Sequence, residues 1–255
     1  MEIPRSEFTS AGFLVTREVE RPSYLSAELL PDRIISTCSC IASFVPDSGC
    51  IRWAQDPPRP RIEYAEKFGL DPAALEEITA WATSRFGTTV RWPNVVSDLD
   101  AAKALVSRFL RDLPGVRVLE LGLHRSMTDV FCQTAEPPPQ KPGFAPIGRE
   151  GVHQLILEGK PLTQSGAVLG FEPRVYLHIL SCSWLCNHLE TVVERALGIK
   201  PNRHGLLERF DDACACVQYI SRDDVPSEPG LWLPWLIVDH TAEVQRPADA
   251  ASRRG

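Results

Sequence analysis

The chain has 255 residues, of which 44% are hydrophobic and 24% are charged, which is the composition of an ordinary folded globular protein. This balance excludes collagen-like, coiled-coil and fully disordered chains. The formal net charge is −6 at pH 7, and Lys and Arg are scattered along the sequence, so we expect neither nucleic acid nor an anionic membrane as a partner.

The N-terminal part of the sequence predicts a cytoplasmic protein that begins with strands. Residues 1–10 contain no basic stretch followed by an apolar segment and a cleavage site, so we expect no signal peptide and a cytoplasmic location. Residues 12–19 and 33–45 are rich in β-branched and small apolar side chains, which predicts two strands.

The middle of the sequence predicts two helices and a strand. Asp71 is a suitable N-cap, and apolar residues then recur at helical spacing, which predicts a helix over 72–86. Ser97 is the expected cap of a second helix. Residues 116–123 alternate as a buried strand does.

A proline-rich segment over 134–146 separates this part from the rest of the chain. Prolines fix φ and lack a donor, so we expect no regular structure there and a boundary between two lobes. Beyond it, the pattern predicts strands over 174–180, 213–220 and 231–238 and a helix over 184–197. Because proline cannot donate to a ladder, Pro234 predicts that the last strand is an edge strand or is broken.

These elements predict an α+β fold, with a mixed α/β topology as the alternative. We expect residues 1–240 to form one globular domain with proline-rich loops, or two lobes, and residues 241–255 to form a flexible tail. No apolar run reaches the roughly 20 residues that a membrane-spanning helix requires.

The eight cysteines are too sparse in a chain of this size to indicate a disulfide framework, so we expect reduced thiols. Cys38 and Cys40, like Cys214 and Cys216, are two residues apart in predicted strands and would point to one face, where they could bind a metal. Free cysteines more often pack as small hydrophobic side chains, so we favour a core role and expect no metal or cofactor.

A candidate catalytic thiol is Cys182, at the junction of a predicted strand and a predicted helix. A helix N-terminus lowers the pKa of a thiol and favours the nucleophilic thiolate. The base would be His124, His188 or His240, and the sequence does not show which of them lies within reach. The favoured interpretation is structural: Cys182 and Cys186 pack together on the inward face of a helix, because no catalytic signature surrounds the cysteine.

Other residue patterns are weaker. Glu158 and Lys160 resemble the E-x-K end of a metal-dependent nuclease strand, with Asp129 or Glu150 as the acidic partner, but a solvated turn is the favoured interpretation. Candidate binding residues are the tryptophans near Pro or Arg, because exposed aromatic rings are typical of recognition surfaces, although burial under proline-rich loops is the more common outcome. They are Trp53, Trp92, Trp232 and Trp235.

The sequence has no dinucleotide-binding glycine motif, no phosphate-binding loop and no G-x-S-x-G. We therefore expect a non-enzymatic protein that binds another, more basic protein. Acidic immunity proteins of bacterial toxin systems share these general properties, which makes neutralisation of a partner protein the leading hypothesis. The alternative is a cysteine-dependent hydrolase or transferase that uses Cys182 with a histidine.

Overall fold

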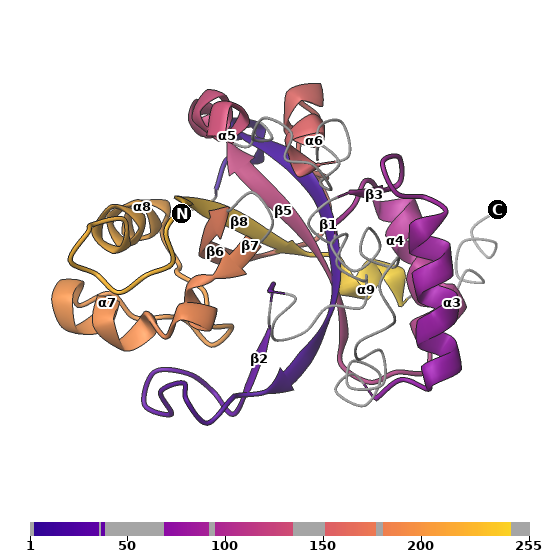
Figure 1. The fold of residues 1–255 in the computed structure, drawn as a ribbon, viewed down its shortest axis with the longest axis horizontal. Coiled ribbons are helices and arrows are strands. Elements are labelled where there is room, and N and C mark those ends of the chain that lie inside the picture. The colour runs from indigo at the N-terminus through magenta and orange to yellow at the C-terminus, as the bar shows by residue number, and fades with distance from the viewer. Residues whose placement is uncertain are drawn as a thin grey trace, which may run out of the picture.

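The protein has the α+β fold that the sequence predicts, and it is built on one curled antiparallel sheet (Figure 1). The computed structural model describes residues 3–35, 37–38, 69–91, 95–134, 151–176 and 181–245. Its strands are β1 (Phe8–Glu20), β2 (Arg33–Ile35), β3 (Val90–Arg91), β4 (Val95–Val96), β5 (Val116–His124), β6 (Ala167–Tyr176), β7 (Ser181–Ser183) and β8 (Leu231–Asp239).

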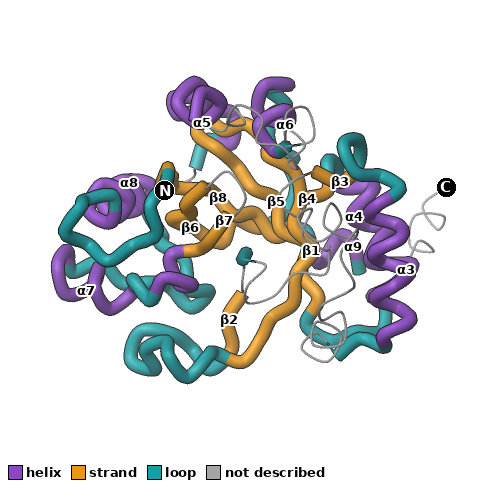
Figure 2. Tube along the Cα trace, in the orientation of Figure 1, coloured by secondary structure: helices purple, strands orange, loops and turns teal. Residues whose placement is uncertain are grey.

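Helices lie around this sheet (Figure 2). They are α3 (Pro72–Thr83), α4 (Leu99–Leu105), α5 (Thr128–Thr134), α6 (Val152–Glu158), α7 (Glu190–Leu197), α8 (Phe210–Ile220) and α9 (Thr241–Val244). Helical turns are η1 (Arg5–Glu7), η3 (Arg125–Met127) and η5 (Trp184–Asn187), and the π-helical turn η2 (Val106–Leu110) continues α4. No helix in the described ranges is long and apolar enough to cross a membrane.

The strand order is β3-β4-β1-β5-β8-β6-β7, with β2 paired to β1. The sheet therefore combines strands from before and after the proline-rich segment, and the last strand, β8, lies between β5 and β6. The long strands β1 and β5 pair from Phe8 and His124 to Arg17 and Val116 and curve together across the molecule (Figure 1).

Three hydrophobic cores fill the spaces between the sheet and the helices. The C-terminal core lies under α7 and α8 and includes Phe171 and Leu236. The N-terminal core lies under α3 and α4 and includes Phe13 and Val118. A third core, which includes Leu119, packs against α5 and α6. Neighbouring residues of β5 thus enter different cores, because side chains alternate between the faces of a strand.

Most of the predicted strands are confirmed, but one is a helix. Strands over 12–19, 116–123 and 231–238 lie within β1, β5 and β8. The strand expected over 213–220 is wrong, since these residues belong to α8. The apolar C-x-C run suggested a strand, but burial follows the helical spacing of Ala213, Cys216 and Ile220.

The interpretation of Pro234 as an edge or broken position is also wrong. Pro234 lies inside β8, a central strand, where it faces Pro173 of β6 across the ladder. Two residues without an N–H donor are therefore opposite each other, and pairing with β5 ends at Trp235. The sheet accommodates both prolines because they occupy a matched position in the two strands.

The predicted helices differ from the observed ones mainly at their ends. Asp71 caps α3 by accepting a 2.7 Å hydrogen bond from the Ala73 N–H. Asp98, rather than Ser97, caps α4. The helix expected over 184–197 is interrupted at His188, whose φ of 55° is left-handed and separates η5 from α7.

Some predictions lie partly outside the described residues. The strand expected over 33–45 begins as β2, and the strand expected over 174–180 is the end of β6, but residues 39–45 and 177–180 are not described. The proline-rich segment is not described beyond Thr134. The segment expected to be a tail begins instead with α9, whose first residue is buried.

Candidate functional site

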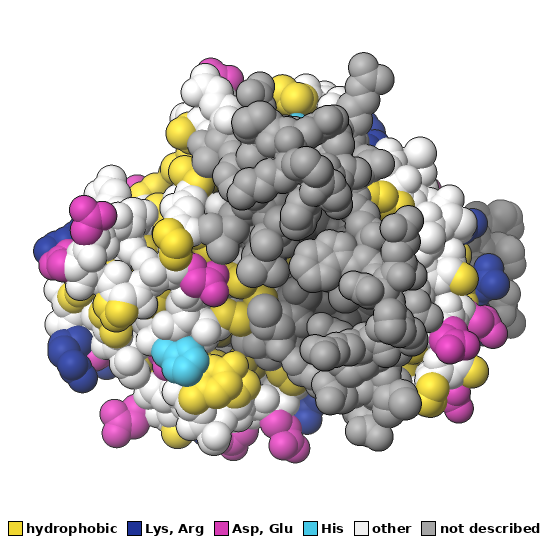
Figure 3. Space-filling model, in the orientation of Figure 1, with side chains coloured by type: hydrophobic (Ala, Val, Ile, Leu, Met, Phe, Trp, Pro, Cys, Tyr) yellow, Lys and Arg dark blue, Asp and Glu magenta, His cyan; other side chains and the backbone are white. Residues whose placement is uncertain are grey.

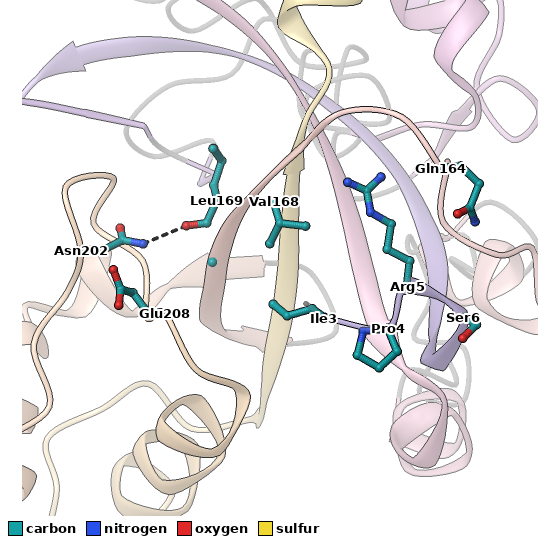
Figure 4. A pocket seen from close by; sticks show the side chains of 10 residues that line it. Ile3, Pro4, Arg5, Ser6, Gln164, Val168, Leu169, Asn202 and Glu208 are labelled. Atoms are coloured by element: carbon teal, nitrogen blue, oxygen red, sulfur yellow. Dashed lines mark hydrogen bonds between the residues drawn. The ribbon is translucent and has the colours of Figure 1, made fainter. Parts of the chain in front are cut away.

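An open groove runs along the N-terminal half of β6. It has a volume of about 800 Å³ and is lined by the N-terminal residues up to Ser6, by Gln164, by β6 and by the loop before α8. Figure 4 shows Asn202 and Glu208 to one side of β6 and the N-terminal residues to the other. The groove thus brings together segments that are far apart in the sequence.

The groove exposes a strand edge. β7 pairs with β6 only from Arg174 to Tyr176, and Leu207 bridges to Phe171 through two backbone hydrogen bonds of 2.7 and 2.8 Å. In the described part of the chain, no strand pairs with Ala167–Leu169 on the side away from β8. The side chain of Val168 is 37% exposed there.

A bulge shapes this edge. The register of β6 against β8 shifts between Val168 and Gly170. Gly170 has a φ of +140°, and a Cβ at this position would lie 2.6 Å from the carbonyl oxygen of Leu207. Only glycine fits this close approach without a backbone shift. Next to the bulge, the amide of Asn202 donates a 2.8 Å hydrogen bond to the carbonyl of Leu169 (Figure 4).

Arg5 fixes the opposite wall of the groove. Its guanidinium donates hydrogen bonds of 2.7 Å to the carbonyls of Thr163 and Gly166, and a further one to that of Ser165. Hydrogen bonds from a charged donor are among the stronger ones in proteins. The N-terminal segment is therefore attached to the loop that enters β6.

A buried charge network lies beneath the same loop. Glu120 of β5 is 1% exposed and accepts hydrogen bonds from the Ser10 hydroxyl at 2.7 Å and from the Thr163 backbone at 3.2 Å. Its second oxygen lies 3.1 Å from Nε2 of His240, whose Nδ1 lies 3.1 Å from a carboxylate oxygen of Glu243. We refer to these five residues as the Glu120 network.

The network favours a charged imidazole. Burial lowers the pKa of His240, but hydrogen bonds and charges from Glu120 and Glu243 outweigh it, so the pKa is raised above its usual value. Burial raises the pKa of Glu243, yet hydrogen bonds from Ser165 and His240 lower it overall. The loop beside the groove is thus held by charged groups on both of its sides.

The candidate catalytic cysteine and histidines make their observed contacts with other residues. Cys182 is 3% exposed within β7, and it is Ser183 that caps η5, by accepting a 3.1 Å hydrogen bond from Leu185. His124 bonds to Ser126 and stacks on Phe210, whereas His188 stacks on Tyr24 with ring centroids 4.3 Å apart. None of these contacts includes Cys182, and His240 belongs to the Glu120 network.

The other cysteines are not arranged as the metal-binding hypothesis requires. Because α8 is a helix, Cys214 is half-buried while Cys216 is buried, so the two thiols do not share a face. Burial raises the pKa of Cys216 to about 12 and, together with Asp211, raises that of Cys214. Cys38 contacts Cys186, and Cys40 lies outside the described residues.

The E-x-K pattern does not end a strand. Glu158 is the last residue of α6, and its carboxylate lies 2.9 Å from the ammonium of Lys160. The strand-end interpretation is therefore wrong. Asp129 lies in the first turn of α5, and Glu150 lies outside the described residues. Among the described residues, no group of three or more His, Cys, Asp and Glu side chains could bind a metal.

Two of the four candidate tryptophans lie within the described residues, and both are in the core. Trp232 is 3% exposed and donates a 3.0 Å hydrogen bond to the carbonyl of Glu228, and Trp235 is fully buried. Both rings therefore contribute to packing rather than to an exposed surface. Trp53 and Trp92 lie outside the described residues.

Comparison with family models, curated protein sequences and solved structures finds no match. The candidate site therefore depends on the geometry of this chain alone.

Sequence reasoning missed every residue of the groove. Val168 and Asn202 lie in segments without a recognisable motif. Arg5 is far in sequence from the carbonyls that it binds, with a separation of 160 residues to Ser165. The only sequence signal near the groove is Gly170 inside an otherwise apolar run, because an isolated glycine in a strand indicates a bulge or a close backbone approach.

Proposed function

We propose that this chain is a cytosolic, non-enzymatic binding protein that neutralises another protein by direct contact, as immunity proteins of bacterial toxin systems do. The observation that carries the proposal is the open edge of β6 within a groove of about 800 Å³. An exposed strand edge is a ready template for an extended segment of a partner, whose backbone adds to the sheet.

The groove favours a basic, extended segment. The Glu208 carboxylate lines it, and the chain as a whole has a net charge of −6. Arg5 also lines it, but its guanidinium donates to three backbone carbonyls. On the described part of the face in Figure 3, acidic and basic side chains are dispersed rather than concentrated. We therefore expect recognition to come from backbone pairing, with charge adding to the association rate.

The edge itself is tested by selecting peptides from a displayed library of random 12-residue sequences against the native protein. We expect selected peptides to alternate apolar and basic residues and to shift the amide resonances of 167–170. Val168→Lys introduces a bulky charge at the edge and should weaken binding at least tenfold. Val130→Lys is the matched control, since Val130 is 44% exposed on α5. Peptides that bind equally to both variants would contradict the proposed site.

Neutralisation is tested in cells that express the product of each adjacent reading frame, with and without this chain. We expect one product to stop growth, co-expression of the chain to restore it, and Val168→Lys to lose protection while Val130→Lys retains it. Association of the purified pair should slow as salt is raised, because complementary fields are screened. Peptide binding without any protected product would retain the groove but reject the neutralising role.

A further inference from the structure

Two cysteines that are distant in the sequence have their sulfurs in contact near the end of β2. The Sγ of Cys186 lies 3.1 Å from the Sγ of Cys38, across a sequence separation of 148 residues. A disulfide bond is about 2.05 Å long, so a movement of about 1 Å brings the pair to bonding distance. Folding therefore places these thiols together before any oxidation takes place.

The two thiols differ in their access to solvent. Cys38 is fully buried in the C-terminal core, whereas Cys186 is only half-buried at η5. A dissolved oxidant therefore reaches Cys186 first. Cys38 is then the neighbouring thiol that can attack the oxidised sulfur, which is the arrangement of an exposed and a resolving cysteine.

A buried cation lies close to this pair. The guanidinium of Arg174 is 2% exposed and interacts electrostatically with the thiols of Cys38 and Cys182. A nearby cation favours the thiolate, which is the nucleophile in thiol–disulfide exchange.

We propose that Cys38 and Cys186 form a reversible disulfide when the protein meets a low-molecular-weight disulfide such as oxidised glutathione. The Cys186 thiolate attacks one glutathione sulfur and releases the other half as a thiolate, which takes up the proton that Cys186 lost. The Cys38 thiolate then attacks the Sγ of Cys186, breaks the mixed disulfide and releases the second glutathione, which takes up the proton from Cys38. Two protein thiols become one disulfide, and one glutathione disulfide becomes two thiols.

The bond joins the segment after β2 to η5. The neighbouring Thr37 donates a hydrogen bond to Glu172, so the disulfide also fixes the residue that connects this segment to the buried Glu172–Arg174 pair. In reducing surroundings both cysteines keep their thiol form, and a shift to oxidising conditions closes the link. The redox state of the surroundings thereby sets the stability of the C-terminal core.

The test treats the full-length native protein with excess oxidised glutathione, then unfolds it and counts alkylatable thiols. We expect the count to fall by two from the eight of the untreated chain, and peptide mapping without reductant to recover one cross-link, between Cys38 and Cys186. Dithiothreitol should restore the full count. The oxidised form should melt several degrees above the reduced form, because the link constrains the unfolded chain.

Two variants separate this pair from the other thiols. Cys186→Ser should lose the cross-link, whereas Cys214→Ser, which alters another half-buried cysteine, should form it as the unsubstituted chain does. The mapping on the unsubstituted chain does not depend on the folding of either variant. Retention of all thiols, a persistent glutathione adduct, a cross-link to another cysteine, or stoichiometric zinc on the purified protein would overturn the proposal.

Discussion

The sheet contains two buried polar clusters that are equally inaccessible but differently bonded. In the Glu120 network, one carboxylate receives donors from β1, from the loop before β6 and from His240. In the second cluster, Glu172 accepts from Thr37 and lies 3.7 Å from Nη1 of Arg174. Both carboxylates are 1% exposed, so burial alone does not distinguish them.

Burial has opposite outcomes in the two clusters. At His240, two carboxylate contacts outweigh desolvation, and the pKa of the imidazole is raised in favour of its charged form. At Glu172, desolvation outweighs the opposing effect of Arg174, and the pKa of the carboxyl is raised in favour of its neutral form. The first cluster therefore holds a charged imidazole between two carboxylates, whereas in the second a carboxyl that favours its neutral form lies beside a buried guanidinium.

Removal of one carboxylate from each cluster should have the largest effect on stability. Glu120→Leu and Glu172→Leu should each lower the free energy of unfolding by about 3–5 kcal/mol, because each removes an acceptor from several donors and from the cation beside it. The clusters should differ in the second step. Adding Arg174→Met to Glu172→Leu should recover at least about 1 kcal/mol, whereas adding His240→Phe to Glu120→Leu should recover none.

The difference in the second step has a physical reason. Both double variants leave hydroxyl donors without their acceptor, those of Thr37 and Ser183 at Glu172 and those of Ser10 and Thr163 at Glu120. Only the change at Glu120 also leaves a backbone N–H, that of Thr163, without its acceptor, and a backbone donor cannot rotate toward a new one. Urea unfolding of the four variants measures the two couplings. Equal recovery in both double variants would contradict this difference between the two clusters.

A smaller effect should follow from crowding the Glu120 network at its edge. A Cβ at Gly166, where φ is +85°, would lie 2.7 Å from Cε1 of His240. Gly166→Ala should therefore lower the free energy of unfolding by about 2–4 kcal/mol, through strain and displacement of the imidazole. Gly159 has a φ of +66° with no atom within 4 Å, so Gly159→Ala should cost only about 1 kcal/mol. Equal losses would mean that backbone strain alone acts at Gly166.

The sequence predicts the elements whose signals are local. It does not predict an element whose structure depends on packing against residues distant in the sequence. Asp71 and the spacing after it are sufficient for α3, and the alternation of 116–123 is sufficient for β5. For α8, the apolar C-x-C run fits a strand as well as a helix, and only packing against β6 and β8 decides. Pro234 looked disruptive because its partner, Pro173, lies 61 positions earlier in the numbering.

The candidate site has the same dependence on distant partners. Glu120 lies in an apolar strand with no motif around it, and the hydrogen bond to His240 spans 120 residues. Arg5 is similarly far in sequence from its carbonyl partners, since 158 residues separate it from Thr163. Composition and spacing carry no information on such pairs, so the groove and its supports emerge only from the folded chain.

Cysteine-to-serine substitutions should show a smaller contrast between charged and apolar surroundings. Cys216 is fully buried among hydrophobic residues of the C-terminal core, so Cys216→Ser should cost about 1–3 kcal/mol for the poorly satisfied hydroxyl. Cys182 interacts with the guanidinium of Arg174, which can orient a hydroxyl. We therefore expect Cys182→Ser to cost less than about 1 kcal/mol, with library peptides still bound. If Cys182→Ser lowered the free energy of unfolding in urea more than Cys216→Ser does, the surroundings of Cys182 would be the more apolar of the two.

The pH dependence of stability should reveal the proton that His240 binds within the Glu120 network. The pKa of His240 is raised above 6.5 in the folded state, so its contribution is fully present below pH 6.5 and is lost as the pH rises through the folded value. The pKa of Glu243 is lowered from 4.5, so its contribution is present above pH 4.5 and is lost as the pH falls through the folded value. The network is therefore most stabilising between pH 4.5 and pH 6.5.

His240→Gln removes that proton and should flatten the decline of the free energy of unfolding above pH 6.5. One proton changes the slope by at most about 1.4 kcal/mol per pH unit, so urea unfolding is measured at half-unit steps from pH 5 to 9. His204→Gln is the control: burial and Arg203 lower the pKa of His204, so its contribution changes below pH 6.5 and the decline above it should persist. An unaltered decline in His240→Gln would show that the imidazole is neutral in the folded protein, and that burial prevails in the Glu120 network as it does at Glu172.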